Sequence, residues 1–66
     1  MITVRDEAIQ ITVSNLISAG VLLPEETRHF IADLDALNDI NLGLRMVESR
    51  HLADLALALS AHQSRN

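Results

Sequence analysis

The chain has 66 residues, a formal net charge of −4 and no cysteine, so it forms one small domain at most and contains no disulfide. Its residues are 48% hydrophobic, but no apolar run approaches the roughly 20 residues that a membrane-spanning helix needs. The acidic balance and the absence of lysine argue against nucleic-acid binding. The first residues, MITVRDE, are acidic where a signal peptide is apolar, so we expect a cytoplasmic protein without membrane contact.

The first helix is predicted at about residues 4–19. Thr3 can cap its N-terminus, with the acidic partner of a capping box three residues later, and Gly20 suits a left-handed stop at its C-terminus. Four apolar residues share one helical face: Ile9, Val13, Leu16 and Ile17. The β-branched triplets at 2–4 and 11–13 leave two short strands as an alternative, although the helix is favoured.

A second helix is predicted at about 24–38, because Pro24 suits a first helical position and the carboxylates after it oppose the helix dipole. Its apolar stripe consists of Phe30, Leu34 and Leu37, with Ile31 beside it. Weak helix formers then gather at 38–43, so we expect a break or a sharp kink there. A third helix follows at about 40–62, and the tail 63–66 is expected to be frayed.

The third helix is apolar on two sides. One stripe follows steps close to the helical period and comprises Ile40, Leu44, Val47, His51, Leu55, Ala58 and His62. A second side carries Leu42, Met46, Ala53 and Leu57. Because two short neighbouring helices can cover only one side well, the other side needs a partner.

The small size of the chain supports the same conclusion. Apolar burial at this mass contributes on the order of 95 kcal/mol, whereas ordering the chain costs about 100 kcal/mol. We therefore expect an all-α domain over residues 1–66, with two or three helices in a hairpin-like protomer that is completed as a homodimeric helical bundle. The predicted self-association residues are Leu44, Val47, Leu52, Leu55 and Leu59.

Acidic residues gather in the second helix, and an acidic surface suits a partner with a basic surface. The predicted partner-binding residues are Glu25, Glu26, Asp33 and Asp35. We expect an interaction protein, such as an adaptor, inhibitor or regulator, with no cofactor and no enzymatic activity. Small acidic helical proteins of this kind are common products of phages and mobile elements, an analogy that rests on size and charge alone.

Two alternative functions remain open. The pairs Glu26 with His29 and Glu48 with His51 have the Glu-x-x-His spacing found in di-iron helical bundles, although the supporting carboxylates are missing. The helix–glycine–helix order at 13–37 has the outline of a helix-turn-helix transcription regulator. Its second helix is acidic, however, where a recognition helix needs basic or amide side chains.

Overall fold

The computed structural model describes residues 2–64, and this range contains three α-helices and no strand. Helix α1 spans Val4–Ser18, α2 spans Thr27–Asp35 after a short 3-10 turn, η1, at Pro24–Glu26, and α3 spans Asp39–Ser64. The all-α prediction is confirmed. The alternative of strands at 2–4 and 11–13 is wrong, because Val4 and residues 11–13 belong to α1.

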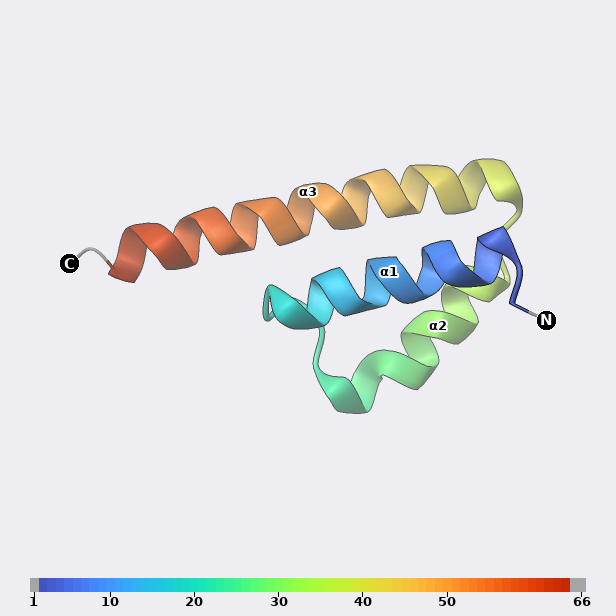
Figure 1. The fold of residues 1–66 in the computed structure, drawn as a ribbon, viewed down its shortest axis with the longest axis horizontal. Coiled ribbons are helices and arrows are strands. Elements are labelled where there is room, and N and C mark those ends of the chain that lie inside the picture. Colours follow the sequence, from blue (N-terminus) through green and yellow to red (C-terminus); the bar gives the residue numbers. More distant parts are fainter. Residues whose placement is uncertain (1, 65–66) are drawn as a thin grey trace.

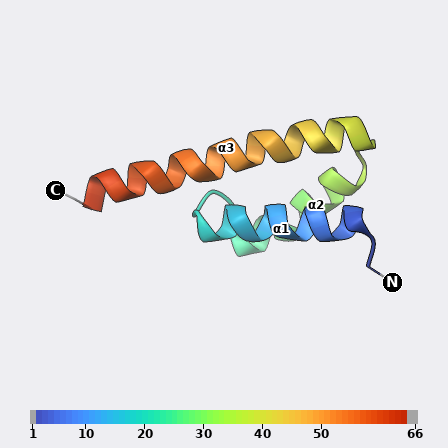
Figure 2. The ribbon, with the colours of Figure 1, turned by 45° about the horizontal axis from the view of Figure 1, so that its top comes forward.

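The three helices do not match in length, and this gives the molecule its elongated shape. Helices α1 and α3 run side by side in the same direction (Figures 1 and 2). Helix α2, which connects them in the sequence, runs in the opposite direction. The 26-residue α3 projects well past the end of the 15-residue α1 (Figure 1). The radius of gyration is 13.0 Å, compared with about 11 Å for a compact chain of this length.

Both ends of α1 follow from the local sequence. The Thr3 hydroxyl accepts a hydrogen bond from the Asp6 backbone N–H at 3.1 Å, and the Asp6 carboxylate accepts from the Thr3 N–H at 3.3 Å. At the other end Gly20 has a φ of +76°, and the Val21 N–H donates to the Leu16 carbonyl at 2.9 Å. These bonds form the predicted capping box and a Schellman-type C-cap.

The buried face of α1 differs from the prediction at one position. Ile9, Val13 and Leu16 are buried as expected, but Ile17 is 37% exposed and Thr12 is buried in its place. The helix is therefore rotated so that the smaller Thr12 faces α3. Its hydroxyl donates to the Ala8 carbonyl at 2.9 Å, so its burial leaves no polar atom without a partner.

The chain breaks between α2 and α3, as predicted. Helix α2 ends at Asp35, three residues earlier than expected. The side-chain oxygen Oδ1 of Asn38 caps α3 by accepting a hydrogen bond from the Asn41 N–H at 2.8 Å. At its other end α3 continues through Ser64, so fraying at 63 and 64 is not observed. The remainder of the expected tail, 65–66, lies outside the described residues.

The core lies where the three helices meet. Its buried hydrophobic residues are Ile9, Val13, Leu16, Leu22, Leu34, Leu42 and Ala53. Leu34 of α2 is completely buried, and the predicted stripe neighbours Phe30, Ile31 and Leu37 are half-buried against the same cluster. The core is therefore small and contains no buried aromatic ring.

Arg5 of α1 joins all three helices at one end of the bundle. Its guanidinium forms an ion pair with Asp39 at 2.7 Å, and it donates hydrogen bonds to the carbonyls of Leu34, Asp35 and Leu37. These carbonyls belong to the last turn of α2 and the segment after it, where carbonyls are not followed by a further helical turn, although the Leu34 carbonyl also accepts from the Leu37 N–H at 3.1 Å. One side chain thus caps α2 and fixes the start of α3.

Candidate protein-interaction surfaces

Only one of the two apolar sides of α3 is covered in the single chain. The covered side faces α1 and α2 and carries Leu42, Met46, Ser49 and Ala53, which are buried or half-buried. Ser49 and Ala53 are small, as is Thr12 on α1, and small facing residues allow two helices to approach closely. Leu57, which was expected on this side, is 52% exposed.

The opposite side of α3, which we call the outer face, has no cover. It consists of Ile40, Leu44, Val47, His51, Leu55, Ala58 and His62, with Leu52 and Leu59 along one edge. The five predicted self-association residues are between 54% and 60% exposed, but Leu52, at the edge, also lines a groove with Leu16 and Phe30. Ile40, at its beginning, is 78% exposed. A contiguous row of this kind is larger than scattered surface hydrophobics and usually marks an interaction site.

The last two turns of α3 are uncovered on every side. Residues 57–63 are all exposed, and Ala53 is the last buried residue of the helix among those described. We call this segment the C-terminal arm. It remains helical beyond its neighbours because alanine and leucine, which dominate it, have high helix propensity.

The single chain exposes more surface than a compact monomer of its mass would. The chain exposes 5228 Å², whereas surface scaling for a compact monomer of 7.3 kDa gives about 4,200 Å². The excess is therefore on the order of 1,000 Å². A standard protein–protein interface buries about 800 Å² on each partner. The excess surface thus matches what one chain contributes to such an interface.

Charged residues border the outer face on both edges. On the edge that holds Leu52, Arg45 and Glu48 form an ion pair at 3.9 Å. On the other edge Arg50 and Asp54 are exposed, and neither forms an ion pair within the described chain. Neither residue is among the predicted self-association or partner-binding residues. The spacing of four residues between Arg50 and Asp54, beside an apolar stripe, was the available signal.

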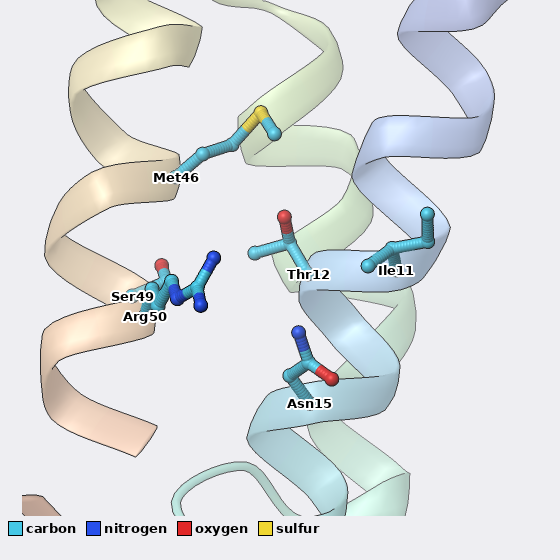
Figure 3. Close-up of a pocket in the computed structure, with 6 residues that line it drawn as sticks. All are labelled: Ile11, Thr12, Asn15, Met46, Ser49 and Arg50. Atoms are coloured by element: carbon cyan, nitrogen blue, oxygen red, sulfur yellow. The ribbon is translucent and has the colours of Figure 1, made fainter. Parts of the chain in front are cut away.

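A hollow of about 120 Å³ lies between α1 and α3 (Figure 3). Thr12 and Asn15 point into it from α1, and Met46 and Arg50 point into it from α3 (Figure 3). Ile11 and Ser49 complete its lining. It is small and contains no cluster of ionisable groups, so it has no feature of a catalytic site.

The predicted acidic residues do not form one surface. Glu25, Glu26 and Asp33 line one groove, which also contains His29 and Phe30. Asp35 lies two residues after Asp33, on a different side of α2, where it lines a separate groove with Asp6 and Gln10. The groove lined by Glu25, Glu26 and Asp33, which we call the acidic groove, remains a candidate site for a basic side chain. Asp35 does not belong to it.

The structure also places the residues of the two alternative functions. Glu26 and His29 line the acidic groove, whereas Glu48 and His51 lie exposed on α3. No group of three or more histidine, aspartate or glutamate side chains among residues 2–63 is arranged to hold a metal ion. The helix–glycine–helix outline is present as α1, Gly20 and α2. The exposed part of α2 carries more acidic than basic side chains.

Comparison with models of protein families, with curated proteins and with solved structures finds no match to this chain. Within the described residues, no helix combines the length and the apolar character needed to cross a bilayer.

Proposed function

We propose that this protein acts by binding other proteins, and that it first assembles with a second copy of itself through the outer face of α3. The observation that carries this proposal is the uncovered row of leucines on the outer face, together with the excess surface of the single chain. An adaptor, inhibitor or regulator needs such contact surfaces and no catalytic groups.

The energetics favour burial of the outer face. Burying a leucine side chain contributes roughly 1.5–3 kcal/mol, and each copy would contribute four leucines and a valine that are half-exposed or more in the single chain. Because these side chains are already about half-buried, two copies together would gain on the order of 10 kcal/mol, which is comparable with the loss of translational and rotational freedom on association. A homodimer completed in this way also supplies the cover that a chain of 66 residues lacks.

The acidic groove gives the assembly a surface for a second kind of partner. Glu25, Glu26 and Asp33 surround an opening of about 260 Å³ that also contains Phe30. A lysine or arginine side chain fits this chemistry, because its carbon stem can lie on an aromatic ring while its charge approaches carboxylates. We propose that a basic-surfaced protein binds here, with charge mainly increasing the rate of association.

Analytical ultracentrifugation at micromolar concentration tests self-association with a matched pair of variants. Leu55 lies on the outer face and Leu57 does not, yet the two are similarly exposed, at 59% and 52%. Leu55→Asp should weaken the dimer at least a hundredfold, because a carboxylate would enter an apolar interface. Leu57→Asp should leave the dimer intact. A wild-type chain that sediments as a folded monomer of 7.3 kDa would contradict the proposal.

The alternative functions have less support and separate tests. A metal protein predicts near-stoichiometric iron, manganese or zinc in purified protein, lost when Glu48 or His51 is changed to alanine. A transcription regulator predicts retardation of duplex DNA at low salt. The regulator alternative does not involve the outer face, and the metal alternative uses only His51 from it, so neither gives a role to its exposed leucines.

A further inference from the structure

We infer that the two copies pair through antiparallel α3 helices, with His51 of each copy beside the two-fold axis. This inference rests on the proposed self-association and specifies its orientation and register. Three features of α3 support it: the spacing of the residues on the outer face, the charges on the edges of that face and the position of the C-terminal arm.

The outer face is symmetric in spacing about His51. Going outward from His51, its residues lie four, seven and eleven positions away in both directions. An antiparallel pair centred on His51 therefore places Val47 level with the partner's Leu55, and Leu44 level with the partner's Ala58. The larger leucine meets the smaller alanine, so the helix axes can stay at a constant separation. In a parallel pair Leu44 would meet the partner's Leu44 and leave two alanines facing each other at 58.

The unpaired charges on one edge become partners in the antiparallel arrangement. Arg50 and Asp54 share an edge, and in this register Arg50 lies about 3 Å along the axis from the partner's Asp54. The two-fold axis repeats the pair, so both arginines and both aspartates find opposite charges. The Arg50 side chain, which points over the hollow near Thr12, has to turn outward to reach (Figure 3). Its exposed position leaves that movement open.

The parallel arrangement fits the same charges less well. There Asp54 would lie beside the partner's Leu52 and the partner's Leu55, with no cation near it. Arg50 would instead meet the partner's Glu48, which already has an ion pair with Arg45 in its own chain. Parallel helices would also align two helix dipoles head to head, whereas antiparallel dipoles attract.

The antiparallel pair also gives each C-terminal arm a neighbour. The first half of α3 is supported from behind by α1 and α2, while residues 57–63 have no support in the single chain. When the helices run in opposite directions, each bare arm lies along the supported half of the partner's α3. A parallel pair would place the two bare arms side by side beyond both cores.

Disulfide trapping tests the orientation directly, because the chain has no native cysteine. Leu44→Cys and Ala58→Cys variants are prepared separately, mixed in equal amounts, allowed to exchange subunits and oxidised mildly. The antiparallel pair should give mainly the mixed 44–58 disulfide. In this arrangement residue 44 of one copy lies about 21 Å along the helix axis from residue 44 of the other copy. Disulfides require Cα atoms within about 7 Å. Leu44→Cys alone should therefore give little cross-linked dimer.

A dominant 44–44 disulfide would overturn the antiparallel pairing while leaving the proposed dimer intact. No cross-linking in any mixture, with dimers still present by ultracentrifugation, would overturn the use of the outer face. A monomeric wild-type chain would remove the proposed function itself. The three failures are thus distinguishable.

Charge reversal provides a second measurement. Arg50→Glu alone and Asp54→Arg alone should each weaken the dimer about tenfold, and the two together should restore the wild-type dissociation constant to within about threefold. Circular dichroism of the diluted monomers checks that helix content is unchanged. If Glu48→Arg, rather than Asp54→Arg, restores the dimer of Arg50→Glu, the helices are parallel and the inference is wrong.

Discussion

Arg5 and Asp39 stand 34 residues apart in the chain, and their side chains meet at 2.7 Å where α1, α2 and α3 converge. The two partners differ in environment: the Arg5 side chain is 27% exposed and the Asp39 side chain 94%. An ion pair to so exposed a carboxylate contributes little, because water and salt screen it. The stabilising role of Arg5 therefore lies mainly in its hydrogen bonds to the backbone at the end of α2.

Arg5→Met should lower the free energy of unfolding by about 2 kcal/mol, because the carbonyls of Leu34 and Leu37 lose a charged donor in a partly buried place. Asp39→Asn should change it by less than about 0.5 kcal/mol. Urea denaturation followed by circular dichroism measures both, at one fixed protein concentration because self-association would shift the midpoint.

Arg5→Lys serves as the control for charge. A lysine keeps the positive charge near Asp39 but cannot direct several donors toward neighbouring carbonyls as a guanidinium does. We expect it to be nearly as unstable as Arg5→Met. Full stability in Arg5→Lys would show that charge alone matters and that the capping role is wrong.

The two glycines should respond in opposite directions to alanine. Gly20 has a φ of +76°, so Gly20→Ala should destabilise the protein by about 1 kcal/mol even though no atom lies within 4 Å of the new Cβ position. Gly43 lies inside α3, where a Cβ would also have open space, so Gly43→Ala should stabilise by up to about 1 kcal/mol. Thermal unfolding of both variants beside the wild type gives the comparison. Equal signs would contradict the assigned helix boundaries.

Neutralising the acidic groove should weaken binding of a basic ligand without unfolding the protein. Glu25→Gln with Asp33→Asn removes two exposed carboxylates, and we expect about three- to tenfold weaker binding of a fluorescent lysine- and arginine-rich peptide at low salt. Glu26 is left unchanged because its carboxylate accepts from the Leu23 N–H at 3.3 Å at the start of η1. Fluorescence anisotropy at several salt concentrations is the measurement.

Asp35→Asn is the matched control, since it removes a carboxylate from the same helix but from a different groove. It should leave peptide binding almost unchanged apart from a small long-range effect. Asp33→Asn made alone removes the same single charge from the acidic groove, and equal losses in it and in Asp35→Asn would mean that the peptide responds to net charge alone and that the acidic groove is not a site.

The two ends of α1 and the start of α3 could be predicted because their causes are local, whereas α2 ends three residues before its predicted end. Thr3, Gly20 and Asn38 act on neighbours within six residues, and each caps its helix as its residue type suggests. The role of Arg5 could not be predicted, since its partners lie 29 to 34 residues away. A local pattern contains no information about such contacts.

The side of α3 that faces α1 was also beyond the sequence pattern. Both sides are apolar with helical spacing, so periodicity alone could not choose between them. In the structure the covered side includes the small residues Ser49, which lines one hollow with Thr12, and Ala53, whereas Leu44 and Leu55 stay exposed. On α1 the small Thr12 is likewise buried, whereas Ile17 is 37% exposed.

If two copies pair as proposed, the bare C-terminal arm makes the lifetime of each chain depend on the concentration of the protein. A solitary molecule presents two turns of unprotected, leucine-rich helix to proteases and chaperones, and these act on segments that open easily. Rising abundance would hide that segment by mass action and lengthen the lifetime of every copy. The degradation rate of each copy would then fall as the concentration of the protein rises.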